Sequence, residues 1–177
     1  MSQLKEGWEK VITEWFLPMY NWGRGTGFRW ARKGDPNAGE PDALYEDEGT
    51  RERVWMEITT AYYDDTHAMA EWQKARGKSS EPYMLTKPDR VENQRLLDQV
   101  EERLRQKLQK PAGHYKVSEP VLLLVFTKSF RLHLGGRSIR ERLEALVVPE
   151  IHPFQEIYIV SETPEVYQIF PERGMIA

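Results

Sequence analysis

Two acidic residues, Asp42 and Glu57, have a type and spacing that could support chemistry. They lie in the stretch from Gly39 to Tyr63, which reads GEPDALYEDEGTRERVWMEITTAYY. Asp42 precedes a short run of strand-forming residues, and Glu57 lies in the middle of a second run, residues 54–62. If the two runs form a hairpin, the carboxylates meet at one edge of a sheet. Such a pair needs a cation between its members or a shared proton.

Alternation along the second run orients its side chains. In a strand, successive side chains point to opposite faces, so Glu57 and Thr59 share one face and Ile58 belongs to the other. Thr59 is therefore expected beside Glu57, on the face where a site would form.

Elements that could position these residues are predicted along the whole chain. Apolar residues recur at helical spacing or gather in short strand-like runs. The expected helices are residues 3–17, 67–76, 89–107 and 139–147, and the expected strands are residues 27–31, 43–45, 54–62, 121–126, 157–160 and 166–170. Pro18 is expected to end the first helix. This order predicts an α/β fold with a mixed central sheet flanked by helices, and residues 1–177 form one domain.

Composition excludes several classes of function. The chain has no cysteine and a formal net charge of −3, with 40% hydrophobic and 30% charged residues. Disulfides and thiolate chemistry are therefore excluded, and the four histidines lack the spacing of a zinc site. The longest apolar run is too short to cross a bilayer, and the N-terminus lacks a signal-peptide core. A cytoplasmic protein with no membrane partner is expected.

A glycine-rich segment between Trp22 and Gly39 is the most basic stretch in the first half of the chain. Its basic residues are Arg24, Arg29, Arg32 and Lys33. Basic side chains among aromatic residues and glycines suit a nucleic-acid backbone, and Lys74 is expected to extend this group. A solvated turn followed by an edge strand is the alternative.

Polar residues also interrupt the expected helical faces. Asn93 falls on the apolar face of the helix 89–107, with Gln94 beside it, so each is either a satisfied core amide or part of a site. Glu9 and Glu14 flank the apolar stripe of the first helix. They are either solvated boundary residues or additional carboxylates above the site.

The element order and the acidic pattern resemble those of the PD-(D/E)XK nuclease superfamily, the restriction-endonuclease-like proteins. Pro41-Asp42 opens one strand and Glu57-x-Thr59 lies on the next, and the resemblance covers roughly residues 3–126. It implies an αβββαβ restriction-endonuclease-like core, here with extra C-terminal strands. It also implies hydrolysis of phosphodiester bonds, most readily in DNA.

The resemblance assigns a role to each matching position. Asp42 and Glu57, together with the main-chain carbonyl of Ile58, would bind Mg²⁺, with Mn²⁺ as a substitute. The cation would activate a water and stabilise charge on the scissile phosphate. Asn93 or Gln94 would contact the bound water or a phosphate.

The chain departs from the superfamily pattern at Thr59, where the motif has a lysine. A hydroxyl group supplies no positive charge, so a basic residue reaches in from elsewhere, or the site needs none, or the site is inactive. Lys107 is disfavoured because it lies about 20 Å along its helix from Asn93, whose end of the helix is expected nearer the strand. The favoured substitutes are Lys74, Arg76 and Lys87.

Two other functions stay open. The chain could be a catalytically inactive module that binds nucleic acid or protein on the same fold. Alternatively, Glu46, Asp47 and Glu48 form only a solubilising turn, and the protein is a structural subunit. The sequence does not decide between a monomer and a homodimer.

Overall fold

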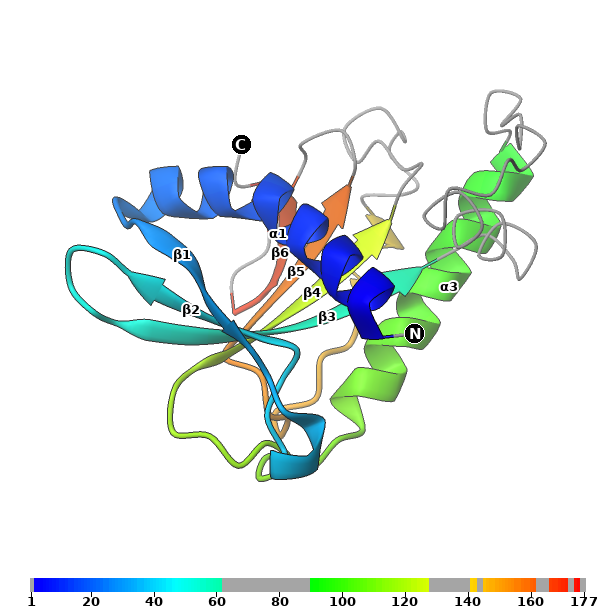
Figure 1. Ribbon diagram of the computed structural model, residues 1–177. Coiled ribbons are helices and arrows are strands. Elements are labelled where there is room, and N and C mark those ends of the chain that lie inside the picture. The colour runs from blue at the N-terminus through cyan, green and yellow to red at the C-terminus, as the bar shows by residue number, and fades with distance from the viewer. Residues whose placement is uncertain are drawn as a thin grey trace.

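A mixed sheet of seven strands lies between two helices in the computed structural model of the protein (Figure 1). The structure describes residues 2–61, 90–127, 141–142, 145–161, 166–171 and 174–175, without the side chains of 2–8, 90–94 and 174–175. Within these ranges no helix has the length and apolar character needed to span a membrane. The mixed α/β class expected from the sequence is confirmed. The expected helix 67–76 falls outside the described residues, as do residues 139–140 and 143–144 of the expected helix 139–147.

The sheet combines antiparallel edges with a parallel centre. Its strands are β1 (Phe28–Lys33), β2 (Ala43–Asp47), β3 (Arg53–Ala61), β4 (Val121–Thr127), β5 (Glu156–Ser161), β6 (Val166–Phe170) and β7 (Gly174–Met175). They lie in this order across the sheet. Strands β3, β4 and β5 are parallel, and every other neighbouring pair is antiparallel. The connection from β3 to β4 includes helix α3 (Arg90–Leu108), as a parallel pair requires a crossover.

Helix α1 (Ser2–Arg24) covers one face of the sheet and continues past its expected end at Pro18. Phe16 and Tyr20 lie on either side of this proline, and both are buried against the sheet. A proline inside a helix removes one hydrogen bond. Because burial of an apolar helix face contributes more than local propensity, packing keeps this helix intact.

Helix α3 covers the opposite face, which creates two cores separated by the sheet. All seven residues of β4 are buried, as its continuous apolar run predicts for a central strand. Leu122 and Leu124 pack in the core beneath α1, whereas Leu123 and Val125 pack in the core beneath α3. The same alternation places Trp55 in the α3 core and Met56 in the α1 core, so Glu57 faces α3.

Candidate active site

Asp42 lies where strand β2 begins and its pairing with β3 ends. The last paired residues are Ala43 and Met56, yet β3 continues to Ala61 alongside β4. The main-chain N–H of Ile58 therefore has no partner in β2, and it donates instead to Oδ2 of Asp42 at 2.8 Å. Since the N–H and C=O of one strand residue point to the same side, the Ile58 carbonyl faces Asp42 as well.

The position of Asp42 depends on a close crossing of the chain. Gly34, after β1, donates its N–H to the carbonyl of Asp42 at 2.9 Å. A Cβ atom at Gly34 would lie 1.6 Å from the carbonyl oxygen of Pro41. Only glycine permits this approach, so Gly34 sets where Asp42 meets β3.

Glu57 accepts hydrogen bonds from two ammonium groups. Its Oε1 atom lies 2.5 Å from Nζ of Lys107 and 3.1 Å from Nζ of Lys110. Lys110 also donates to the hydroxyl of Tyr115 at 2.8 Å, and its Nζ atom is 4.7 Å from the centre of that ring. The Glu57 side chain is 8% exposed, so these contacts form in a largely dehydrated environment. Asp42, Glu57, Lys107, Lys110 and Tyr115 are called the acid–lysine cluster below.

The position of Lys107 contradicts the expectation that this end of the helix lies far from the two acidic residues. Strand β4 is parallel to β3, so the crossover helix must run back along the sheet before β4 begins. The last turn of the helix therefore lies over the middle of β3, where Glu57 is. The apolar stripe that includes Leu104 and Leu108 packs on the sheet and turns Lys107 toward Glu57.

The electrostatics of the cluster keep Glu57 ionised. Burial raises the pKa of this carboxyl, but the ammonium groups of Lys107 and Lys110 outweigh burial and hold the pKa below its usual value. Burial, together with the charges of Glu57 and Asp42, raises the pKa of the Tyr115 hydroxyl. The phenol therefore stays protonated at neutral pH. The cluster holds two carboxylates and two ammonium groups, and their charges cancel.

The donor atoms of the cluster suit a magnesium ion. Asp42 and Glu57 provide carboxylate oxygens, and the Ile58 carbonyl faces the same place. Across the described ranges no group of three or more acidic, histidine or cysteine side chains could hold a metal. Mg²⁺ commonly binds one or two carboxylates and keeps several waters, so this small set of hard oxygens fits it. A cation here would have to compete with the two lysines for Glu57.

Of the other residues expected in the active site, Thr59 lies on the same strand as Glu57, whereas Asn93 and Gln94 lie at the far end of α3. Thr59 is half-buried on the same face as Glu57, paired in register with Val125. Asn93 and Gln94 lie in the first turns of α3, about 20 Å along the axis from Lys107. Their side chains lie outside the described set, as do the three favoured substitutes for the motif lysine, Lys74, Arg76 and Lys87.

Arg24 lies on the opposite face from the acid–lysine cluster. Its Nη2 atom is 2.5 Å from Oε1 of Glu156 and 3.2 Å from the hydroxyl of Tyr158, at the end of α1. The guanidinium also lies 4.7 Å from the centre of the Tyr20 ring. Glu156 is 9% exposed, so this ion pair neutralises a buried charge. Arg24 therefore has a structural role in the described protein.

The arginines of β1 lie on the face of α3. Arg32 forms a two-point ion pair with Glu40, both contacts being 2.7 Å, and stacks over the Trp55 ring. Arg29 pairs with Glu48 at 2.9 Å, and its side chain is 73% exposed. Lys33 is half-buried at the end of the strand. Of these basic residues, Arg29 is the one most open to solvent.

The acidic turn between β2 and β3 is held by one of its own side chains. Asp47 is 3% exposed and accepts hydrogen bonds from the main chain of Gly27, Gly49 and Thr50. These donors hold the pKa of Asp47 below its usual value, with Gly27 contributing most. The turn is thus organised by hydrogen bonds and is more than a solubilising sequence.

Glu9 and Glu14 of helix α1 do not reach the cluster. Glu9 is 4% exposed and lies near Tyr45 in the core beneath α1, across the sheet from Glu57. Glu14 is exposed on the outer side of the same helix. The alternative that one of them is an additional carboxylate above the site is therefore wrong, because α1 and Glu57 occupy opposite faces. The other alternative, a solvated boundary residue, fits Glu14 but not the buried Glu9.

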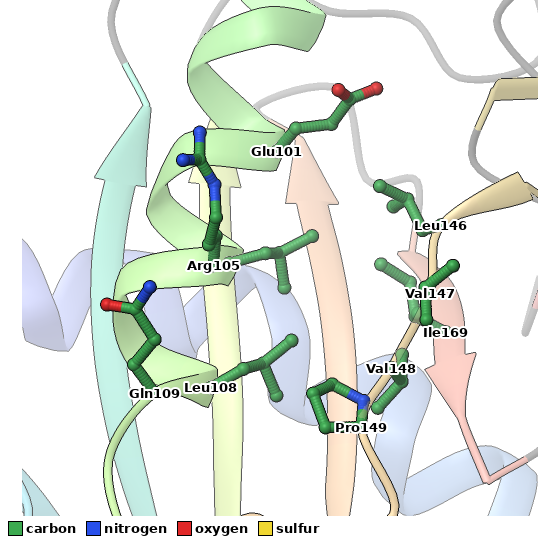
Figure 2. Close-up of a pocket in the computed structure, with 10 residues that line it drawn as sticks. Glu101, Arg105, Leu108, Gln109, Leu146, Val147, Val148, Pro149 and Ile169 are labelled. Atoms are coloured by element: carbon green, nitrogen blue, oxygen red, sulfur yellow. The ribbon is translucent and has the colours of Figure 1, made fainter.

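A separate apolar cavity of about 510 Å³ lies on the face of α3, between that helix and residues 146–149 (Figure 2). The residues that line it include Leu108 of α3, Ile169 of β6, and Val148. Glu101 and Arg105 are the charged residues among those that line it. It includes none of the residues that contact Glu57, so it is distinct from the acid–lysine cluster.

Two members of the cluster, Lys110 and Tyr115, were missed in the sequence. They follow the end of α3 in a segment without a motif. The signal that could have found them is topological: a crossover between parallel strands returns the chain to the start of the first strand.

No protein-family model, curated protein or solved structure matches this chain in a comparison with known proteins.

Proposed function

We propose that the protein is a divalent-cation-dependent nuclease of the PD-(D/E)XK type that hydrolyses phosphodiester bonds in DNA. The observation that carries the proposal is the contact of Lys107 with Glu57, on the face where Asp42 meets β3. It supplies the charge that Thr59 lacks. A lysine beside two carboxylates is the combination that the superfamily pattern requires.

Each residue of the cluster has a role in this proposal. Asp42, Glu57 and the Ile58 carbonyl would hold Mg²⁺, or Mn²⁺ in its place. The cation supplies a water of lowered pKa and balances negative charge on the phosphate. Lys107 orients that water by hydrogen bonding and adds a positive charge next to the scissile group.

The order of elements supports the proposed fold assignment. Helix α1, strands β1 to β3, helix α3 and strand β4 follow one another as in the αβββαβ core, and β5 to β7 extend the sheet. Arg29 and Arg32 lie on the same face as the acids, where they could contact the phosphate backbone of DNA.

A non-catalytic nucleic-acid- or protein-binding module is the second candidate. The observation in its favour is that Lys107 and Lys110 already neutralise Glu57. A carboxylate satisfied in this way needs no cation for stability.

A cleavage assay with Mg²⁺ on labelled single- and double-stranded DNA and RNA tests the proposal. The key variant is Asp42→Asn, whose amide oxygen still accepts the hydrogen bond from Ile58. We expect cleavage to fall at least about 100-fold, a loss typical of removing one electrostatic group. Asp98→Asn, which changes an exposed carboxylate on α3, is the matched control and keeps wild-type activity.

Thermal unfolding of each variant shows that its fold is intact. Cleavage by Asp42→Asn at the wild-type rate would refute the assignment of the site. If the wild-type protein cleaves none of the four substrates and calorimetry detects no Mg²⁺ binding, the non-catalytic module is correct.

A further inference from the structure

Lys110 differs from Lys107 in having a second acceptor within the cluster. Its ammonium lies 3.1 Å from Oε1 of Glu57 and 2.8 Å from the hydroxyl of Tyr115. Lys107 makes the shorter contact with Glu57, at 2.5 Å, and belongs to helix α3. Lys110 follows the end of that helix. Its contact with Glu57 is longer, and its main chain lies outside the helix.

The charge balance of the cluster makes the two lysines sensitive to a cation. The side chains of Lys107 and Lys110 are 22% and 24% exposed, and that of Glu57 is 8% exposed. Charges this poorly hydrated interact strongly. A divalent cation on Glu57 would repel both ammonium groups and leave the cluster with two positive charges in excess. An anion would then restore the balance.

We propose that Lys110 is a phosphate-binding residue that leaves Glu57 when a divalent cation binds there, and that Tyr115 keeps it at the site. This inference rests on the proposed function and adds a residue to it. The Tyr115 hydroxyl and ring hold the ammonium beside the cluster after Glu57 is occupied. The ammonium then donates to an oxygen of the DNA phosphate, in place of the carboxylate oxygen it has lost.

Two opposite effects follow for a variant that lacks the Lys110 charge. The ammonium competes with the cation for Glu57, so its removal strengthens cation binding. The same ammonium contacts the phosphate, so its removal weakens DNA binding when the cation is present. A lysine that served only to neutralise Glu57 would change the first property and leave the second unchanged.

Tyr115 separates these two effects. Tyr115→Phe keeps the ring beside Lys110 and removes the hydroxyl acceptor. Because Lys110 still competes for Glu57, cation binding does not become tighter. DNA binding weakens, because the ammonium has lost the group that holds it beside the phosphate.

Calorimetric titration with MnCl₂ and fluorescence anisotropy with a labelled phosphorothioate DNA duplex test the inference. The proteins compared are the wild type, Lys110→Met, Lys110→Gln, Lys110→Arg, Tyr115→Phe and the control Lys10→Met. Lys10 is an exposed lysine of α1, across the sheet from the cluster. Circular dichroism identifies the variants that fold. Two uncharged replacements of Lys110 are included so that the test still holds if one of them does not fold.

We expect the uncharged Lys110 variants to bind Mn²⁺ about 10-fold more tightly than the wild type, within the usual range of coupling between sites. They bind the duplex about 10-fold more weakly in the presence of Mn²⁺, and Lys110→Arg and Lys10→Met resemble the wild type. Unchanged Mn²⁺ affinity, or unchanged duplex affinity, refutes the inference and leaves the proposed function intact. Absence of Mn²⁺ binding in every protein refutes both.

Discussion

Nζ of Lys107 lies 2.5 Å from Oε1 of Glu57, although 50 positions separate the two residues in the chain. Glu57 is in the middle of β3, and Lys107 is in the last turn of α3. The contact exists because α3 runs back along the sheet before β4 begins. In the proposed nuclease, this lysine of the helix takes the role of the lysine that the strand lacks.

Replacement of Lys107 by methionine tests this substitution directly. Lys107→Met keeps most of the side-chain length and removes the ammonium, so we expect Mg²⁺-dependent cleavage to fall about 100-fold. The measurement is the single-turnover rate on a labelled DNA duplex. Lys10→Met is the control, because Lys10 is an exposed lysine of α1 across the sheet from the cluster, and its rate stays near that of the wild type. Equal rates for Lys107→Met and wild type would show that the contact has no catalytic role.

Glu57 makes the stability of the protein depend on pH. Its pKa is lowered in the folded state because, despite burial, Lys107 and Lys110 favour the ionised form. The ionised carboxylate therefore stabilises the fold above the unfolded pKa of about 4.3, and this contribution is lost as pH falls through the lower folded value.

The free energy of unfolding of Glu57→Gln, measured with urea, shows this dependence. We expect the variant to be less stable than the wild type by about 1–3 kcal/mol at neutral pH, since two ammonium groups lose their counter-charge. The difference shrinks as pH falls below about 4. If the difference in free energy of unfolding between variant and wild type is the same at neutral and acidic pH, Glu57 is not the source of the pH dependence.

Gly34 is predicted to tolerate no side chain. A Cβ atom there would collide with the carbonyl oxygen of Pro41, so we expect Gly34→Ala to lower the free energy of unfolding by more than about 2 kcal/mol. Gly113→Ala is the matched control, because nothing lies within 4 Å of a Cβ at that position. Its effect stays within about 0.5 kcal/mol. Urea unfolding measures both, and similar losses in the two variants would contradict the close crossing.

Loss of charge is predicted to lower the stability of the protein at Arg24 and to weaken DNA binding at Arg29. Arg24→Met removes the ion pair of the buried Glu156 and leaves it the hydrogen bond from Tyr158, so the free energy of unfolding falls by about 1–3 kcal/mol. Arg29→Met changes an exposed residue and leaves stability within about 0.5 kcal/mol of the wild type. Its DNA affinity falls, and the salt dependence of binding becomes shallower by about one unit of slope.

Thermal unfolding and anisotropy at several salt concentrations separate the two arginines. If Arg29→Met binds DNA like the wild type at every concentration, the β1 face is not the DNA-binding face.

Local patterns predicted the parts of the protein that depend on neighbours in sequence. Alternation of side chains placed Glu57 and Thr59 on one face of a strand, and a continuous apolar run identified β4 as a buried strand. A hairpin turn of a few residues brought Asp42 level with Glu57. The end of α1 at Pro18 was predicted wrongly, because burial of Phe16 and Tyr20 outweighs the cost of one proline.

The alternation of side chains along β3 and the short turn before it can be read from the residues alone, and they predict that Asp42 and Glu57 belong to one face of the sheet. The basic partners of the buried carboxylates follow instead from how the helices pack on the sheet. Lys107 and Lys110 reach Glu57, and Arg24 reaches Glu156 across 132 positions of the chain. The two lysine contacts depend on the direction of the crossover helix α3, and the Arg24 contact depends on the face of the sheet that α1 covers. Both are set by packing of the whole domain.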